Sequence, residues 1–359
     1  MEYKLTGLEN IATPALVFYK EVIKENIALA IKIAASPSRI RSHVKSHKTV
    51  EVAKMQMKAG IVKFKTATIA ETEMLAMEGF ADLMLAYPLV GVNIARFIAL
   101  VQKYHKTKFS AITDDPAMVE TISAVAKAAD VTINLLVDVD PGMHRTGIDF
   151  SHAAELFRKI DTTPNLHAMG FHVYDGHNHD KDFELRSKNA KVVYDRSIAI
   201  KKELEAEGKT IETIVLGGTP SFPCHAQFSN NNGIFEPGVE LSPGTCFLQD
   251  YSYQNNLPDI PFKPAALLVT RVVSKPNGKL AFDIGYKAVA SDPLPDNRAH
   301  LIKPVKNQLE PIPFTFVMQN EEHLVLDVPN IKAAVGDLFY AIPTHICPTS
   351  ALYEEILVA

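Results

Sequence analysis

Apolar runs of strand length alternate with helix-like segments through the first two thirds of the chain. The runs predict strands at residues 15–19, 39–46, 65–69, 82–87, 108–113, 133–138, 167–174 and 214–218. Segments rich in helix formers predict helices at residues 50–59, 71–78, 92–104, 117–129, 151–159 and 182–207. Thr49 and Asp115-Pro116 are typical of helix starts, and Gly208 is typical of a helix end.

Eight strands with intervening helices favour an α/β fold, a parallel (β/α)8 TIM barrel. A doubly wound open sheet is the alternative. No Gly-x-Gly-x-x-Gly turn follows the first strand, which weakens a dinucleotide-binding interpretation. After Pro243 the pattern changes to strand-like runs separated by Pro, Asn and Gly turns, at residues 262–274, 280–283, 314–318 and 324–327. We therefore predict a barrel at residues 10–243 and a C-terminal all-β domain at residues 244–359.

Composition narrows the class of protein without indicating its chemistry. The 359 residues are 47% hydrophobic and 22% charged, as in ordinary soluble globular proteins. The net charge of -4 gives no reason to expect a nucleic-acid surface, and no apolar run is long enough to cross a membrane. The chain start lacks a signal-peptide pattern, and three cysteines cannot all pair with each other. We expect a cytoplasmic protein with reduced thiols.

Lys45 lies at the predicted carboxyl end of the second strand, within Arg41-Ser-His-Val-Lys45-Ser-His-Lys48. A lysine amine condenses with an aldehyde cofactor only when it is deprotonated, and nearby positive charge favours that state. Arg41, His43, His47 and Lys48 would supply such charge. The carboxyl ends of the strands form the catalytic end of a barrel. A solvated basic turn is the alternative interpretation of this segment.

Two further loops follow predicted strands and could bind a cofactor. Gly217, Gly218 and Thr219 open a turn in which backbone N–H groups and a hydroxyl could approach a phosphate. Arg145, in Gly142-Met-His-Arg-Thr-Gly147, could form a hydrogen bond with a cofactor ring. An ordinary turn and a solvated loop are the respective alternatives.

The segment His172-Val-Tyr-Asp-Gly-His-Asn-His179 concentrates imidazoles, a phenol and a carboxylate near a strand end. Such groups can exchange protons near neutral pH, so His177 and His179 are candidate bases and Tyr174 is a candidate cofactor contact. The same cluster could instead hold a metal ion.

His345 and Cys347 are two residues apart. In an extended segment alternate side chains face the same side, so both could reach one ion. An imidazole with a thiolate favours Zn²⁺, with Mn²⁺ or Mg²⁺ as alternatives. The remaining coordination positions would be taken by water and substrate. A buried cysteine beside a structural histidine is the other interpretation.

Taken together, these segments resemble the fold-type III pyridoxal phosphate (PLP) enzymes, a group with an alanine racemase-like barrel. More narrowly, they resemble the D-threonine aldolase and D-serine dehydratase branch. The resemblance spans nearly the whole chain. Besides the Lys45 and His345 segments, it rests on Thr13-Pro-Ala-Leu16, Ala67-Thr-Ile-Ala-Glu71-Thr-Glu73, Gly142-Met-His-Arg-Thr-Gly147, Leu241-Ser-Pro-Gly244, Glu321-Glu-His323 and Gly336-Asp337.

The resemblance implies that Lys45 binds PLP and that His345 and Cys347 bind the metal ion. It also implies that residues 1–9 can join the β-domain and that the enzyme is a head-to-tail homodimer. Ser42 stands where the family usually has proline, a change that should not affect the chemistry. Only a short segment follows Thr349, so the family's final strand is expected to be missing.

The same resemblance implies a PLP- and divalent-metal-dependent lyase acting on small D-3-hydroxy amino acids. In an aldolase, a base such as His177 or His179 removes the β-hydroxyl proton, and glycine and an aldehyde form. In a D-serine dehydratase, Lys45 removes the Cα proton, and a keto acid and ammonia form. We favour the aldolase. A racemase and a non-catalytic PLP-binding protein are further alternatives.

Overall fold

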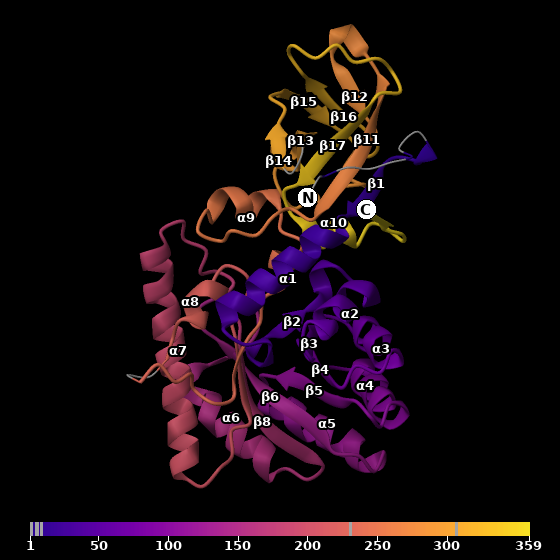
Figure 1. Ribbon diagram of the computed structural model, residues 1–359. Helices are drawn as coiled ribbons and strands as arrows, with labels where there is room; N and C mark the ends of the chain where they lie inside the picture. Colours follow the sequence, from indigo (N-terminus) through magenta and orange to yellow (C-terminus); the bar gives the residue numbers. More distant parts are fainter. Residues whose placement is uncertain (1–2, 4–6, 8–9, 230–231, 306–307) are drawn as a thin grey trace. The chain divides into compact units, whose positions relative to one another are not determined.

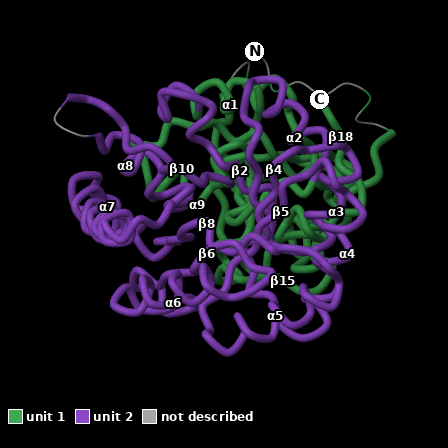
Figure 2. Tube along the Cα trace, turned by 90° about the horizontal axis from the view of Figure 1, so that it is seen from below, with its two compact units in different colours: residues 1–30, 46–48, 245–359 green, residues 31–45, 49–244 purple. Residues whose placement is uncertain are grey.

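The computed structural model describes residues 3, 7, 10–229, 232–305 and 308–359. The chain forms two compact units, which Figure 2 shows in different colours. Unit 1 contains residues 1–30, 46–48 and 245–359, and unit 2 contains residues 31–45 and 49–244. Most of residues 1–9, the segment expected to join the β-domain, lies outside the described residues, although Tyr3 donates its hydroxyl hydrogen to the Pro264 carbonyl within unit 1.

The parallel barrel predicted from the sequence is confirmed in unit 2 (Figure 1). An isolated parallel bridge between Ile40 and Leu241 brings the first and last strands together. Inside the barrel, one layer of buried side chains comes from five neighbouring strands: Met84, Ile112, Leu136, Met169 and Val215. The strands are β2 (Arg41–His43), β3 (Lys63–Thr66), β4 (Asp82–Pro88), β5 (Lys108–Thr113), β6 (Ile133–Asp140), β8 (Leu166–Val173), β9 (Thr213–Leu216) and β10 (Val239–Leu241), and β7 (Ile148–Asp149) pairs with β6.

The six helices predicted between the strands are present, each within a few residues of its expected bounds. Asp115 accepts a hydrogen bond from the Ala117 N–H at 2.6 Å, and Pro116 is the first helical residue, as predicted. Thr49 occupies the N-cap position but makes no capping hydrogen bond with its side chain. These helices are α2 (Val50–Lys58), α3 (Ile69–Met77), α4 (Val92–Lys103), α5 (Pro116–Ala128), α6 (Phe150–Thr162) and α7 (Phe183–Ala206), followed by the short α8 (Phe222–Ala226). The helix α1 (Lys20–Ala34) was not predicted.

The prediction was wrong about which segment supplies the eighth barrel strand. Residues 15–19 do contain a strand, β1 (Ala15–Phe18), but it pairs antiparallel with β11 (Ala266–Ser274) in the sheet of unit 1. The eighth barrel strand is instead β10, which carries Glu240 at its centre. A carboxylate in a three-residue strand interrupts the apolar pattern. All four residues of β1 are buried, so their pattern could not indicate which sheet they join.

Ion pairs join the beginnings of the barrel strands. The Arg41 guanidinium lies 2.5 Å from Glu240 Oε2 and 2.6 Å from Asp82 Oδ1, and Lys63 Nζ lies 2.7 Å from Glu240 Oε1. Burial raises the pKa of the Glu240 carboxyl, but Arg41 and Lys63 outweigh burial and hold that pKa below its ordinary value. The charge of Arg41 is therefore neutralised at this end of the barrel, contrary to the expectation that it acts on Lys45.

Unit 1 contains the predicted β-sheet, which is antiparallel apart from one pair of strands. The sequence did not indicate four of its strands, at residues 299–305, 308–311, 338–343 and 357–358, or the short helices α9 (Tyr251–Asn256) and α10 (Ile346–Ser350). The final strand expected to be missing is present as β18 (Leu357–Val358), which pairs in parallel with β1. Two residues are too few to give a periodic signal. The other strands are β12 (Leu280–Phe282), β13 (Ala299–Val305), β14 (Gln308–Pro311), β15 (Thr315–Gln319), β16 (Leu324–Asp327) and β17 (Leu338–Pro343).

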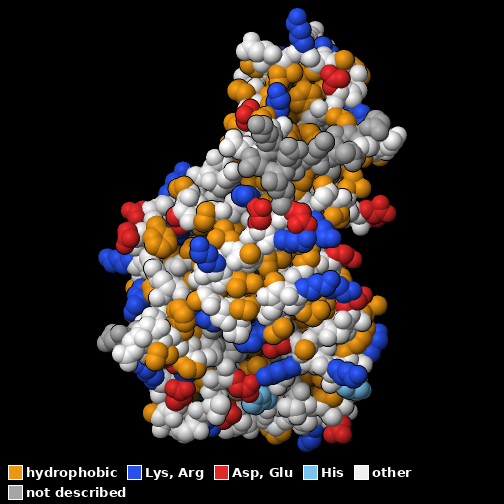
Figure 3. Space-filling model, in the orientation of Figure 1, with side chains coloured by type: hydrophobic (Ala, Val, Ile, Leu, Met, Phe, Trp, Pro, Cys, Tyr) orange, Lys and Arg blue, Asp and Glu red, His pale blue; other side chains and the backbone are white. Residues whose placement is uncertain are grey.

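On the face drawn in Figure 3, acidic and basic side chains are interspersed. This agrees with a net charge of only -4. Among the residues that the structure describes, no helix is both long enough and apolar enough to cross a membrane.

Candidate cofactor pocket and metal site

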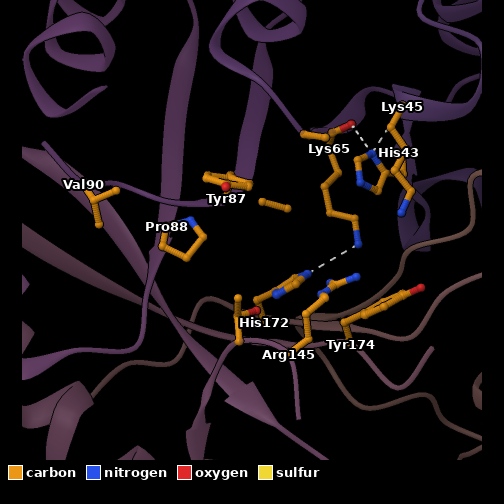
Figure 4. A pocket seen from close by; sticks show the side chains of 12 residues that line it. His43, Lys45, Lys65, Tyr87, Pro88, Val90, Arg145, His172 and Tyr174 are labelled. Carbon is orange, nitrogen blue, oxygen red and sulfur yellow. Dashed lines mark hydrogen bonds between the residues drawn. The ribbon is translucent and has the colours of Figure 1, made fainter. Parts of the chain in front are cut away.

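A cavity of about 470 Å³ opens at the carboxyl ends of the barrel strands (Figure 4). Its lining combines two lysines, an arginine and two histidines with aromatic and small side chains. None of the described lining residues is an Asp or a Glu, so the cavity favours anions. The lining residues are His43, Lys45, Lys65, Ala67, Ala86, Tyr87, Pro88, Val90, Arg145, Thr146, His172 and Tyr174.

Lys45 lies in a single 3₁₀ turn, η3 (Val44–Ser46), directly after β2. The predicted strand at residues 39–46 is therefore shorter than expected, although the lysine still falls at the carboxyl end of the barrel. Lys45 is half-buried, and its backbone N–H donates to His43 Nδ1 at 3.4 Å. Its Nζ lies 5.6 Å from the centre of the Tyr174 ring. The structure thus places this amine in the cavity.

Arg145 and Tyr174, both predicted as cofactor contacts, line the same cavity. The guanidinium carbon of Arg145 lies 4.9 Å from the centre of the Tyr174 ring, a cation–π distance. A Cβ atom at Gly218 would come within 2.9 Å of Tyr174 Cε2, so glycine at this position lets the ring approach the loop. The structure therefore brings Lys45, Arg145 and Tyr174 together.

The sequence pattern did not indicate Lys65 as a cavity residue, and it indicated His172 only as one of several imidazoles in the segment at residues 172–179. Lys65 is only 2% exposed, and its Nζ lies 3.5 Å from His172 Nε2. Burial lowers the pKa of Lys65 far below its ordinary value, and the charges of Lys45, Arg41 and Arg145 add to this effect. Burial also lowers the pKa of His43 and of His172. The cavity thus contains buried nitrogen bases whose neutral forms are favoured.

A signal for Lys65 was present in the sequence. The strand was predicted to start at Lys65, which made the lysine resemble a solvated strand end. In the structure β3 begins at Lys63, and Phe64 between the two lysines is buried against Phe80. Because alternate residues of a strand face the same side, Lys65 points into the barrel when Phe64 points out. A lysine within an apolar strand of a barrel is therefore a candidate interior residue.

The Gly217–Thr219 loop is supported by a buried hydrogen-bond network. Asp175 accepts from Ser221 Oγ at 2.5 Å and lies 2.9 Å from His225 Nε2. Gly217 has φ +73°, and a Cβ atom there would come within 2.7 Å of Ser221 Oγ, so the loop requires glycine. The Gly217 N–H is already used, because it donates to the Val173 carbonyl at 2.9 Å.

Thr219 Oγ1 accepts a hydrogen bond from the Gly244 N–H at 3.2 Å. Burial raises the pKa of Asp175, but His225 and Ser221 outweigh burial and lower it, so the network contains a carboxylate.

His177 and His179, the predicted bases, are exposed and do not contribute to the lining of the cavity. His177 packs on the loop after β6, because a Cβ atom at Gly142 would come within 3.1 Å of His177 Nε2. In this structure the histidines inside the cavity are His43 and His172.

His345 and Cys347 lie in unit 1, and the expectation that both occupy an extended segment was wrong. His345 is extended, but it caps the short helix α10, and Cys347 lies in the first turn of that helix. Pro348 is tolerated there because the first helical N–H groups have no partner within the helix. Asp250 Oδ2 accepts from the Ile346 N–H at 3.2 Å and so stabilises the helix start.

Neighbouring polar groups orient these two side chains. His345 Nδ1 lies 2.6 Å from Asp292 Oδ2, which leaves Nε2 to face an ion. Cys347 Sγ lies 3.0 Å from Ser46 Oγ and 3.3 Å from Thr245 Oγ1. Burial lowers the pKa of His345, but Cys347 and Asp292 outweigh burial and raise it to about 9. A carboxylate behind the imidazole and hydroxyls beside the sulfur fit a metal-binding pair.

Within the described part of the chain, no group of three or more His, Cys, Asp or Glu side chains is arranged to hold a metal ion. A metal held by His345 and Cys347 would therefore take its other ligands from water or substrate, as a catalytic ion does.

Two family models match the chain. One, described as "Alanine racemase, N-terminal domain", matches residues 20–241, and the other, described as "Putative serine dehydratase domain", matches residues 265–359. The first match alone covers more than half of the chain. The chain belongs to the alanine racemase N-terminal domain family. The predicted resemblance to fold-type III PLP enzymes is thereby confirmed, and this family is PLP-dependent.

The relatives of this fold-type III chain are PLP-dependent lyases. D-threonine aldolase from Arthrobacter sp. is 25% identical, and the match covers 98% of this chain and 90% of the relative. 3-Hydroxy-D-aspartate aldolase from Paracoccus denitrificans is 27% identical, and the match covers 98% of this chain and 89% of the relative.

Solved structures show the same fold. D-threonine aldolase from Filomicrobium marinum has a TM-score of 0.83 at 24% identity, with 97% of this chain and 91% of that chain covered. A cysteine-to-alanine mutant of D-threo-3-hydroxyaspartate dehydratase in its metal-free form has a TM-score of 0.82 at 19% identity. The match covers 99% of this chain and 96% of that chain.

Proposed function

We propose that this protein is a PLP- and divalent-metal-dependent lyase that cleaves D-3-hydroxy amino acids by a retro-aldol reaction. The observation that carries the proposal is the cavity in which Lys45, Arg145 and Tyr174 meet, with no carboxylate among the described lining residues. PLP and an amino acid are both anionic, so this lining complements them. When bound, PLP supplies an electron sink that stabilises negative charge at Cα of an attached amino acid.

The residues of the cavity and those of the Gly217–Thr219 loop, which is not among the described cavity lining, have distinct roles in this proposal. Lys45 holds the cofactor covalently through its amine, and Tyr174 packs beside it. Arg145 binds an anionic group of the cofactor or the substrate. The Thr219 hydroxyl is a contact for the cofactor phosphate, and Gly217 and Gly218 leave room for that group. The network of Asp175, Ser221 and His225 holds this loop in place.

His345 and Cys347 would hold the metal ion in unit 1. Nitrogen and sulfur ligands suit Zn²⁺ better than Mn²⁺ or Mg²⁺. A divalent ion there would polarise the β-hydroxyl of the substrate and make its proton easier to remove. The fit rests on Asp292 behind the imidazole and on the two hydroxyls beside the Cys347 sulfur.

D-serine dehydratase chemistry is the second candidate. The observation in its favour is the match of residues 265–359 to a serine dehydratase domain. In that reaction a base removes the Cα proton and the β-hydroxyl leaves as hydroxide, and the products are a keto acid and ammonia. The relatives include both aldolases and a D-serine dehydratase from Dictyostelium discoideum that is 23% identical, and we favour the aldolase because two of the aldolases are 25% and 27% identical.

Product analysis separates the two reactions. The protein would be loaded with PLP and Zn²⁺ and incubated with D-threonine, with L-threonine as the matched control. Glycine and acetaldehyde from the D-isomer alone are the expected products. Ammonia and 2-oxobutanoate would establish dehydration, and no turnover of D-threonine, D-serine or 3-hydroxy-D-aspartate would contradict the proposal of a lyase.

We also propose a cytoplasmic head-to-tail homodimer. The homodimer rests on the family resemblance alone, and the cytoplasmic location rests on three cysteines that cannot all pair with each other. Light scattering coupled to size exclusion would test the homodimer: a mass of twice 39.6 kDa is expected, and a monomer that is fully active would contradict it.

A further inference from the structure

Lys65 brings a second amine into the cavity that contains Lys45. It belongs to β3, and its side chain runs through the barrel interior toward His172 on β8, as Figure 4 shows. Lys65 lines the cavity although it is only 2% exposed, so its amine faces the cavity and not bulk solvent. Neither the Lys45 chemistry nor the metal pair requires this residue.

A chain of polar contacts leads from this amine into the protein. Lys65 Nζ lies 3.5 Å from His172 Nε2, and His172 Nδ1 lies 2.7 Å from Asp138 Oδ1. Asp138 is buried, and its other oxygen has no hydrogen-bond partner among the described residues. That carboxylate also lines a small cavity of about 10 Å³, room for about one water molecule. Asp138 thus fixes the His172 ring, and His172 fixes the lysine amine.

The charged groups around Lys65 favour its neutral form. Lys45, Arg145, His43 and His172 face it from η3, the loop after β6, β2 and β8, and Arg41 of β2 adds positive charge although it is paired with Glu240 and Asp82 at the other end of the barrel. Asp138 of β6 is the carboxylate that acts against them. Burial in such surroundings disfavours an ammonium ion and leaves an amine with a lone pair, which can accept a proton.

We propose that Lys65 is the base that removes the β-hydroxyl proton of the substrate, and that His172 and Asp138 are positioning residues for its amine. The inference rests on the proposed retro-aldol function. It replaces His177 and His179, the bases suggested by the sequence, because those side chains are exposed and lie outside the cavity lining.

The proposed step balances without an added reactant. The β-hydroxyl proton passes to the Lys65 amine, and the O–H electron pair forms the carbonyl of the departing aldehyde. The Cα–Cβ bond breaks, and its electron pair remains with Cα and the electron sink. The ammonium of Lys65 then returns the proton to Cα, which gives glycine and the neutral amine again.

The kinetic test uses Lys65→Ala with added small amines. Loss of a general base is expected to lower kcat about 10²- to 10⁴-fold while the visible absorbance of bound PLP is retained. Methylamine and ethylamine are expected to restore part of kcat, which a purely structural role would not allow. Lys201→Ala is the matched control, because Lys201 is a buried lysine elsewhere in unit 2. Unchanged kcat, or absence of rescue with PLP still bound, would overturn the inference.

A second measurement needs neither cofactor nor turnover. A lysine whose pKa falls on folding destabilises the folded state below its unfolded pKa, and the loss grows as the pH falls toward the folded pKa, because the unfolded chain binds an extra proton in that range. Lys65→Met should therefore raise the urea midpoint of the PLP-free protein more at about pH 7 than at about pH 10. A midpoint difference that does not change with pH would contradict a neutral Lys65.

The two experiments separate this inference from the proposed function. If wild-type protein forms glycine and aldehyde and Lys65→Ala does so equally well, the retro-aldol proposal stands and the role of Lys65 is refuted. If wild-type protein forms no aldehyde from any D-3-hydroxy amino acid, both are refuted.

Discussion

The two ends of the barrel contain similar basic side chains in opposite electrostatic situations. At the end where the strands begin, Arg41 and Lys63 contact the carboxylates of Glu240 and Asp82. At the end where they finish, the described lining residues of the cavity include Lys45, Lys65 and Arg145 but no carboxylate. The cations of the first end are neutralised by the protein itself, whereas the cavity at the second end has no carboxylate in its described lining and can accept an anion from outside.

The comparison indicates where stability and where function reside in this barrel. Breaking a buried ion pair leaves an uncompensated charge and destabilises the fold. Buried cationic groups without carboxylates do not help folding, and groups with shifted pKa values cluster at functional sites. Substitutions at the two ends should therefore have opposite consequences for stability and for cofactor binding.

The largest effect is expected at the cavity end. Lys45→Ala should abolish the visible absorbance of covalently bound PLP and lower activity by roughly 10³-fold or more, because the covalent link is lost. Lys63→Ala, a lysine of the opposite end, is the control and should retain the absorbance. Absorbance that persists in Lys45→Ala would refute the assignment of this lysine.

Glu240→Gln should lower the stability of the fold and leave PLP binding unchanged, in contrast to Lys45→Ala. It removes the carboxylate shared by Arg41 and Lys63, and the free energy of unfolding is expected to fall by about 3 kcal/mol. Urea denaturation would measure the loss, while the titration of PLP absorbance should be unchanged. Lys54→Ala breaks an exposed pair with Glu78 and should change stability by less than about 0.5 kcal/mol. Equal effects of the two variants would show that the buried pairs are not stabilising.

Cys347→Ala should lower Zn²⁺ affinity about 100-fold, because one of the two proposed protein ligands would be lost. Equilibrium dialysis would measure the loss, and Cys224→Ala, a buried cysteine of unit 2, is the control. In the wild type, a proton must leave His345 before the metal binds, and the pKa of His345 is raised to about 9. Affinity should therefore rise with pH up to about pH 9. Metal content that is the same in both variants would exclude Cys347 as a ligand.

Asp175→Asn should have the smallest effect. It weakens the network behind the Gly217–Thr219 loop. PLP affinity is expected to fall about tenfold, because the substitution removes one hydrogen bond to a charged group. Because folding lowers the pKa of Asp175, its carboxylate stabilises the fold above its unfolded pKa, and this stability is lost as the pH falls. The stability of the wild type should therefore decrease more steeply below about pH 4 than that of the variant. If the stability of the wild type and that of the variant fell equally with pH, the role of the Asp175 carboxylate would be contradicted.

The comparison also explains what the sequence could predict. Strands buried on both sides and capped helices have local signals, so most of the barrel was predictable. The helix α1 had such a signal too, since Val22, Ile23, Ile27, Ala30 and Ala34 follow helical spacing and are buried. β10 had none, because Glu240 interrupts its apolar pattern and its partners Arg41 and Lys63 are distant in sequence.

The residues of the candidate site likewise divide into those that a local sequence signal indicates and those that it does not. Lys45, His345 and Cys347 lie in motifs, and Arg145 and Tyr174 follow predicted strands, so their positions could be inferred. Lys65 was missed because the predicted strand started two residues late, which made the lysine a strand-end residue and not an interior residue.

The central claim is that the unneutralised end of the barrel holds PLP on Lys45. It is tested most directly by reducing the PLP-loaded protein with borohydride and locating the modified lysine by peptide mass spectrometry. We predict a pyridoxyl group on Lys45 and an unmodified Lys65. A pyridoxyl group on Lys65, or on no lysine of the cavity, would contradict the account.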